Sequence, residues 1–190
     1  LQGGNLGAAE QVFSSILRAN PLEIHSLHFL GVVVCQKGDI AAGVVLIERS
    51  IALDQSRFGP FFSLGRFFVS DGQHKRAIPV LKEAVKRDEK SFDAWNLLAQ
   101  ACFSAEQFQL AITAGRNACA LAPDSAEAHF NLGVYLSAVE ESKAAVLAYR
   151  KAVELCPDYV EAWVNLGNSL VNVEAYVEAV SSYQSALAKD

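Results

Sequence analysis

Two histidines, His25 and His28, stand three residues apart, a spacing that would place both rings on one face of a helix. Imidazole nitrogens are common zinc ligands, and a closed zinc site takes four ligands. The sequence places no Cys or carboxylate where it would complete the set, although Cys35 lies further along the same helical pattern. We therefore expect a solvated or groove-lining pair, and we predict no metal site and no cofactor.

The four cysteines, Cys35, Cys102, Cys119 and Cys156, are irregularly spaced and form no Cys-x-x-Cys pair. Each falls inside a helical pattern of apolar residues. We expect them to be small buried hydrophobic side chains rather than disulfide partners or metal ligands. This use of cysteine fits a reducing compartment, and we predict a cytoplasmic protein.

No catalytic motif is recognisable in the sequence. A phosphate-binding Gly-x-x-x-x-Gly-Lys-Ser/Thr loop and a Gly-x-Ser-x-Gly nucleophile turn are both missing. Carboxylates such as Glu127 and Glu161 stand at predicted helix starts, where the helix dipole favours them without a catalytic role. We predict that the chain is not an enzyme.

Composition narrows the classes of partner. The 190 residues are 52% hydrophobic and carry a formal net charge of −5, with no Lys/Arg cluster, so we expect a packed core and no nucleic-acid partner. Apolar runs stop well short of the roughly 18–20 residues that span a bilayer, so we expect no membrane insertion. No signal peptide is recognisable at the start of the chain, and Met occurs nowhere, which suggests a piece of a longer protein.

A 34-residue repeat organises the chain. A Leu followed by a small residue recurs at Leu30-Gly31, Leu64-Gly65, Leu98-Ala99, Leu132-Gly133 and Leu166-Gly167. Small residues recur at Gly43, Ala77, Ala111, Ala145 and Ala179, and again at Ser50, Ala84, Ala118, Ala152 and Ala186. A large residue opens each unit at Leu27, Phe61, Trp95, His129 and Trp163.

These columns resemble the tetratricopeptide repeat (TPR) signature, with local departures at Gly43, Gly115 and His129. The resemblance implies an all-α fold, a solenoid of helical hairpins wound as a right-handed superhelix. It divides the chain into five full repeats after a preceding second helix, in a single domain over residues 1–190. The predicted boundaries are a partial repeat at 1–23 and repeats at 24–57, 58–91, 92–125, 126–159 and 160–190.

Apolar periodicity of three and four predicts two helices in each repeat. We expect them at 25–37 and 41–53, 59–71 and 75–87, 93–105 and 109–121, 127–139 and 143–155, and 161–173 and 177–189, after a lone helix at 6–19. Asn20, Asp124 and Asp158, each three residues before a Glu, predict capping boxes. Gly38 and Gly72 suit left-handed turns. Glu106, Glu140 and Glu174 hold that place later, where we expect less tightly specified turns.

The resemblance also implies a ligand face, because first-helix residues of TPR proteins line a concave groove. The groove residues that we predict to bind a peptide are Phe62, Arg66, Asn96, Gln100, Phe130, Asn131, Asn165 and Asn168. The Phe side chains either anchor an apolar ligand segment or pack against neighbouring helices. Arg66 is the only basic residue among them, so we do not expect the charged clamp with which some TPR domains hold a C-terminal carboxylate.

Asn131 and Asn165 stand one repeat apart, and Asn96 is nearly in line with them. This resembles a short piece of the asparagine ladder that binds peptide backbone in the TPR region of O-GlcNAc transferases. Phe29 and Ser63 hold the matching places in earlier units, so the ladder is incomplete. The alternative is that Asn is simply common before Leu-Gly in TPR sequences.

Three functions remain open. The first is a non-catalytic scaffold that holds a protein or peptide in the groove. The second is the substrate-recruiting arm of a larger enzyme, such as a glycosyltransferase similar to O-GlcNAc transferase. The third is self-association through uncapped terminal helices, since the last helix displays Val177, Val180 and Leu187 at helical spacing.

Overall fold

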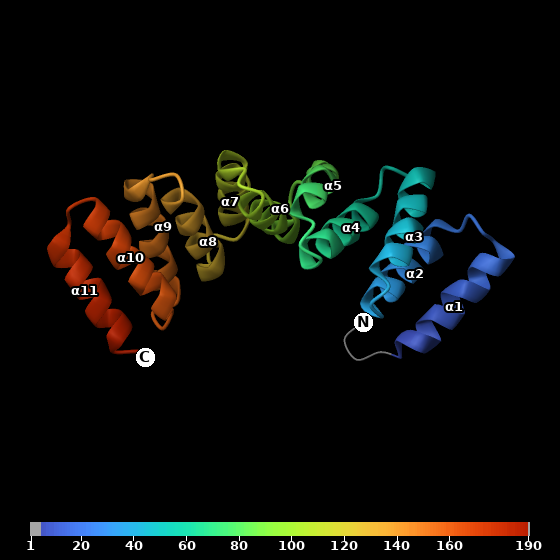
Figure 1. The fold of residues 1–190 in the computed structure, drawn as a ribbon, viewed down its shortest axis with the longest axis horizontal. Coiled ribbons are helices and arrows are strands. Elements are labelled where there is room, and N and C mark those ends of the chain that lie inside the picture. Colours follow the sequence, from blue (N-terminus) through green and yellow to red (C-terminus); the bar gives the residue numbers. More distant parts are fainter. Residues whose placement is uncertain (1–4, 190) are drawn as a thin grey trace. The chain divides into compact units, whose positions relative to one another are not determined.

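The computed structural model describes residues 5–189, and all regular secondary structure in this range is helical (Figure 1). The eleven described helices are α1 (Leu6–Ala19), α2 (Ile24–Gln36), α3 (Ile40–Leu53), α4 (Phe58–Ser70), α5 (His74–Arg87), α6 (Phe92–Ser104), α7 (Phe108–Leu121), α8 (Ala126–Ser137), α9 (Ser142–Leu155), α10 (Val160–Asn172) and α11 (Tyr176–Leu187). The predicted all-α fold of paired helices after a lone one is confirmed, with helix ends that differ by at most two residues.

The contacts of the chain group it into two compact units, Leu1–Glu89 and Lys90–Asp190. The first unit contains α1 to α5 and the second contains α6 to α11. The division falls close to the predicted repeat boundary between residues 91 and 92. The single domain predicted from the sequence stays a prediction.

In the first unit, α2 pairs with α3 and α4 pairs with α5, while α1 packs on α2 and α3 packs on α4 (Figure 1). The centre of this core is apolar: Leu27, Val33, Ile47 and Leu81 are essentially without solvent exposure. Each comes from a column of the repeat or from the apolar face beside one. One hairpin cannot bury such a face alone, so neighbouring hairpins supply the missing contacts.

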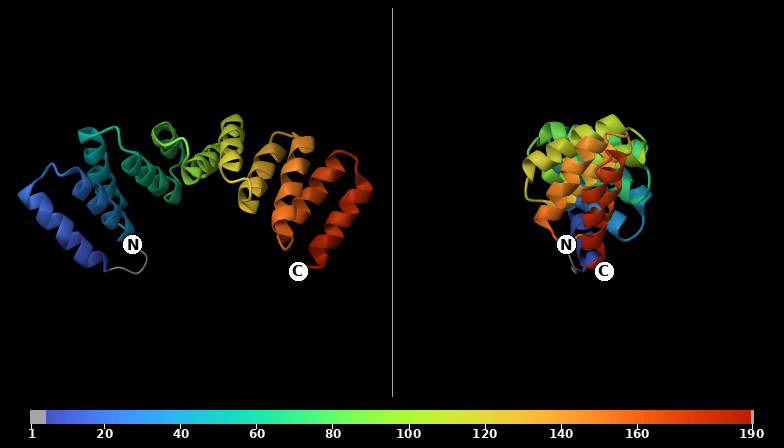
Figure 2. Two further views of the ribbon diagram at one scale, coloured as in Figure 1. Left: turned by 180° about the vertical axis from the view of Figure 1, so that it is seen from behind. Right: turned by 90° about the vertical axis from the view of Figure 1, so that its left-hand side faces the viewer.

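In the second unit, the pairs are α6 with α7, α8 with α9 and α10 with α11 (Figure 2). Their small-residue columns lie where the helices approach, and Ala111 and Ala145 are fully buried. Gly133 shows how tight the approach is, since a Cβ atom there would lie 2.5 Å from Cε1 of Tyr149. The aromatic column thus fills the space that the Leu-Gly column leaves open.

The turn inside each hairpin uses one left-handed residue. Gly38 and Gly72 have φ of 101° and 72°, as predicted. Glu106, Glu140 and Glu174 adopt the same conformation, with φ of 60°, 60° and 62°. The later turns are therefore as uniform as the glycine turns, contrary to the expectation, and they hold a non-glycine residue in a region that costs free energy.

The helix starts differ from the predicted capping boxes. Ser125, not Asp124, caps α8, with its hydroxyl accepting from the Ala128 N–H at 3.2 Å. Glu23 caps α2 instead of Asn20. Tyr159 precedes α10 without a side-chain cap, while the Asp158 carboxylate accepts from Lys189 at 2.5 Å. In each case the helix begins later than the capping-box pattern requires, so the predicted residue lies outside the first turn.

Candidate functional site

The predicted groove residues all lie on the first helices of their hairpins. Phe62 and Arg66 are on α4 of the first unit. The second unit contains the other six, with Asn96 and Gln100 on α6, Phe130 and Asn131 on α8, and Asn165 and Asn168 on α10. Their role in binding stays a prediction.

In the first unit, the two predicted residues differ in how far they are free to bind. Phe62 is half-buried and its ring stacks on Phe58, with 5.3 Å between ring centroids. Arg66 is exposed, and its guanidinium lies 5.6 Å from the ring centroid of Phe67. Arg66 therefore offers a ligand an exposed side chain, whereas part of the Phe62 ring is covered.

In the second unit, the amides of Asn131 and Asn165 are half-buried, and neither forms a hydrogen bond within the described part of the chain. Their helices, α8 and α10, both pack on α9 and touch each other slightly. An uncharged amide offers donors and an acceptor that can satisfy both groups of a peptide bond. Asn168 is partly engaged, because its Oδ1 accepts from the Tyr183 hydroxyl at 2.8 Å.

Phe130 lies beside these amides and packs against two tyrosines. Its ring centroid is 4.7 Å from that of Tyr159 and 5.9 Å from that of Tyr149. The predicted alternative of packing against neighbouring helices therefore applies to Phe130, which nevertheless keeps part of its surface exposed. The aromatic surface that a ligand could meet is the pair formed by Phe130 and Tyr159.

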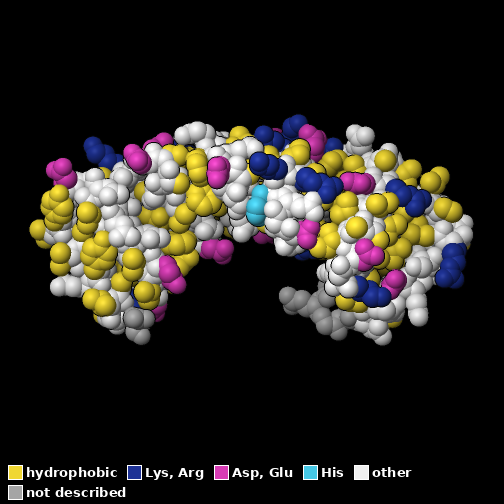
Figure 3. Space-filling view, in the orientation of Figure 1, with side chains coloured by type: hydrophobic (Ala, Val, Ile, Leu, Met, Phe, Trp, Pro, Cys, Tyr) yellow, Lys and Arg dark blue, Asp and Glu magenta, His cyan; other side chains and the backbone are white. Residues whose placement is uncertain are grey.

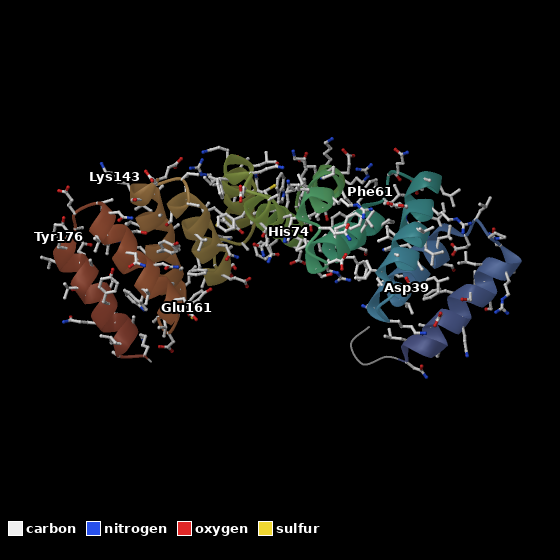
Figure 4. All side chains as sticks on the ribbon, in the orientation of Figure 1. Asp39, Phe61, His74, Lys143, Glu161 and Tyr176 are labelled. Atoms are coloured by element: carbon white, nitrogen blue, oxygen red, sulfur yellow. The ribbon has the colours of Figure 1, made fainter. Side chains whose placement is uncertain are left out.

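Sequence reasoning missed Tyr159, because it stands in the turn before α10 rather than at a first-helix position. Burial raises the pKa of its phenol, and the carboxylates of Glu127 and Glu161 raise it further. These two carboxylates belong to exposed residues in the first turns of α8 and α10, and Figure 4 labels Glu161. The signal that could have indicated Tyr159 is its place two residues before Glu161 in the connecting turn.

His25 and His28 of α2 are not the solvated or groove-lining pair expected from the sequence, because His28 is buried. His28 is buried, and its Nε2 lies 3.0 Å from the Ser63 hydroxyl, while Nδ1 of the exposed His25 accepts from Arg57 at 2.8 Å. Burial, together with the charges of Arg57 and His25, lowers the pKa of His28 to about 4. Within residues 5–189, no group of three His, Cys, Asp or Glu side chains is arranged to hold a metal ion.

The four cysteines are free thiols. Cys35, Cys102 and Cys119 are buried, as predicted, and Cys156 is half-buried. Burial raises the pKa of Cys35 and of Cys119 to about 11, which keeps these thiols protonated and unreactive at neutral pH. Of the helices in the described part of the chain, none has the length and apolar character needed to cross a membrane.

Family models match the same repeats that the helices define. Tetratricopeptide repeat models match residues 62–126 and 162–190, and a TPR repeat model matches residues 141–173. Together they cover more than half of the chain. The chain belongs to the tetratricopeptide repeat family. Within this TPR chain, His129 replaces the usual Trp, and its Nε2–H donates to the Pro123 carbonyl at 3.1 Å as the Trp163 indole does to Pro157 at 2.8 Å.

Solved structures with the same fold include MamA and YrrB. One crystal structure of MamA is 28% identical in sequence to this chain, with a TM-score of 0.79. The match covers 84% of this chain and 94% of the MamA chain. A second MamA structure is 25% identical with a TM-score of 0.80, and the match covers 96% of this chain and 92% of that chain. YrrB, a TPR protein with an unusual peptide-binding site, has a TM-score of 0.85 at 18% identity. The match covers 94% of this chain and 92% of the YrrB chain. No curated protein matches this chain in sequence at a significant level.

Proposed function

We propose that this TPR chain is a non-catalytic scaffold that holds an extended peptide segment of another protein on the first helices of its second unit. The observation that supports this most directly is the pair of unpartnered amides of Asn131 and Asn165, one repeat apart on α8 and α10. Family membership supports protein binding in general. A peptide-binding site in YrrB is a further indication from a protein of the same fold.

The spacing of the amides suits a backbone ligand. Packed helices lie roughly 8–10 Å apart, and an extended chain advances about 3.3 Å per residue. One amide per repeat would therefore meet about every third residue of the peptide. Because the amides bind backbone groups, the grip tolerates many sequences, and the surface of Phe130 and Tyr159 would add a preference for an apolar side chain.

The acidic residues beside the amides add a second preference. Glu127 and Glu161 are exposed at the starts of α8 and α10. They would favour a ligand without carboxylates near this end of the site, since like charges across an interface oppose binding. This fits the scarcity of basic groove residues, which argues against recognition of a ligand's C-terminal carboxylate.

The experiment begins with a random peptide library panned against the chain, followed by fluorescence polarisation with the selected peptide. The double variant Asn131→Ala with Asn165→Ala should weaken binding by about tenfold or more, since each net hydrogen bond contributes about 1 kcal/mol. Its melting temperature should stay unchanged, because neither amide bonds to the described protein.

Asn117→Ala is the matched control, because this amide lies on α7 and donates to the Thr113 carbonyl at 2.9 Å. It should leave peptide binding unchanged. Full binding by the double variant would remove the proposed role of the amides. The two other functions expected from the sequence, an enzyme arm and a self-association module, stay predictions.

A further inference from the structure

A second candidate binding surface lies in the first unit, where α3 meets α4 and the start of α5. The structure has a pocket of about 580 Å³ here, within the range of roughly 300–1,000 Å³ known for ligand sites. Its floor is apolar, with the buried side chains of Val44 and Phe68. Val45, 55% exposed, extends the apolar surface to the rim. None of the residues predicted from the sequence as groove residues lines this pocket.

The rim of the pocket is acidic. Asp39, Glu48 and Asp71 line it, and all three are exposed. Asp39 is held in place at the start of α3 (Figure 4), where its carboxylate accepts from the Ala42 N–H at 3.0 Å. Glu48 forms no ion pair or hydrogen bond with any residue that the structure describes. Its charge is therefore available to a ligand.

Arg76 is the one basic residue that lines the pocket, and its charge is already engaged. Its guanidinium lies 4.2 Å from the ring centroid of Phe68 and donates to Oε1 of Gln73 at 2.6 Å. Three carboxylates thus surround an apolar floor with one cation that is turned toward a ring and an amide. The balance of charge at the rim is negative.

The corresponding positions of the second unit carry a different arrangement of charges. Three 34-residue steps later, Arg150 stands at the place of Glu48 and Glu178 at the place of Arg76. Those two residues form an ion pair with each other. In the first unit the two charges are reversed, no such pair forms, and Glu48 is left unpaired beside exposed apolar surface.

We propose that this α3–α4 pocket binds a basic segment of a partner protein. An apolar side chain of the segment lies on Val45, beside the small exposed parts of Val44 and Phe68. A Lys or Arg next to it in the segment lies among Asp39, Glu48 and Asp71. Apolar contact gives the affinity, and the carboxylates select for positive charge and steer the encounter. This surface is separate from the amides of the second unit, and it does not depend on the function proposed for them.

The probe is a fluorescein-labelled peptide with Lys-Leu-Lys at its centre, flanked by Gly and Ser, and binding is followed by polarisation at low salt. Two further peptides, with Lys-Ser-Lys and Glu-Leu-Glu at the centre, test the apolar and the charged contact. We expect the Lys-Leu-Lys peptide to bind, and the other two to bind at least about tenfold more weakly, because each lacks one of the two contacts. Binding should weaken as salt rises.

The variant Glu48→Lys should weaken binding of the Lys-Leu-Lys peptide by about tenfold or more, since attraction at the rim becomes repulsion. Lys keeps the helix propensity of Glu at this exposed position, and circular dichroism checks the fold. The control is Glu154→Lys, which makes the same charge change at an exposed position on α9, outside the pocket. It should leave binding unchanged.

Three results would overturn the proposal. One is a Lys-Leu-Lys peptide that does not bind the wild-type chain, and another is equal loss in the Glu48 and Glu154 variants. The third is loss of binding in the Asn131→Ala, Asn165→Ala variant with full binding in Glu48→Lys, which would place the peptide on the second unit. The amide site can fail its own test while this pocket passes, because the two tests use different variants.

Discussion

At the scale of single residues, His28 links burial to stability. Its pKa in the folded chain is about 4, below the ordinary 6.5, because burial and then the Arg57 charge disfavour the imidazolium. The unfolded chain therefore binds a proton at higher pH than the folded chain does. The contribution of His28 to stability is complete above about pH 6.5 and is lost as the pH falls toward 4.

Urea unfolding of the wild type and of His28→Gln at several pH values between 7 and 4 tests this. We expect the wild type to lose more free energy of unfolding over this range than the variant, since carboxylates contribute equally to both. A direct check is the titration of the His28 ring by NMR, which should show a neutral ring at pH 6. Parallel pH dependences of the two proteins would contradict the prediction.

At the scale of elements, the left-handed turns are a measurable source of strain. A non-glycine residue in this conformation costs roughly 1–2 kcal/mol. Glycine removes that cost, but it also makes the unfolded chain more flexible, which lowers stability by about 0.4–1 kcal/mol. We expect Glu106→Gly to raise the free energy of unfolding by up to about 1 kcal/mol. Gly72→Ala should lower it by a similar amount, because φ there is 72°. Thermal unfolding measures both, and a Glu106→Gly variant less stable than wild type would show that its side chain has a structural role.

The small-residue columns make a second prediction at this scale. Ala145 is fully buried between helices, so Ala145→Leu should overpack the hairpin and cost about 1–3 kcal/mol of stability. Ala120→Leu is the matched control, because Ala120 is exposed on α7 and has room for the larger side chain. Denaturant titration of both variants measures the difference. Equal stabilities would mean that the column does not set the helix spacing.

The repeat explains how far these elements could be predicted. Five aligned copies of one pattern fixed the helix ends to within two residues, since each column constrains the same turn of each hairpin. The predicted helix caps were wrong, because the choice between Asp124 and Ser125 depends on where the first turn begins. The repeat columns do not contain that information. The α3–α4 pocket was not predicted either. Its shape depends on how the side chains of α3, α4 and α5 pack, and its charge depends on whether Glu48 forms an ion pair. The repeat pattern determines neither of these.

At the scale of the whole molecule, the last helix exposes apolar surface. Val177, Val180 and Leu187 of α11 are 83%, 54% and 76% exposed, and Figure 3 shows hydrophobic side chains over this helix. Self-association through this face stays a prediction from the sequence. Light scattering should then give a mass that rises above 20.5 kDa with concentration, and Val180→Glu should abolish the rise. A mass of 20.5 kDa at every concentration would contradict it.

The two compact units raise the question of whether they unfold separately or as the single domain expected from the sequence. Both tryptophans, Trp95 and Trp163, belong to the second unit, so their fluorescence reports on that unit. Far-UV circular dichroism reports on the helices of both. Leu81, fully buried in the first unit, gives a way to weaken that unit alone, since Leu→Ala in a core costs about 2–5 kcal/mol.

We expect the urea transition of Leu81→Ala to begin earlier by circular dichroism than by fluorescence, because stability in repeat proteins is a sum of local terms and neighbour contacts. The fluorescence midpoint should stay near that of the wild type. Coincident transitions by both probes, shifted together by the substitution, would show that the two units unfold as one cooperative domain. The matched substitution Leu166→Ala, in the second unit, should instead move the fluorescence transition.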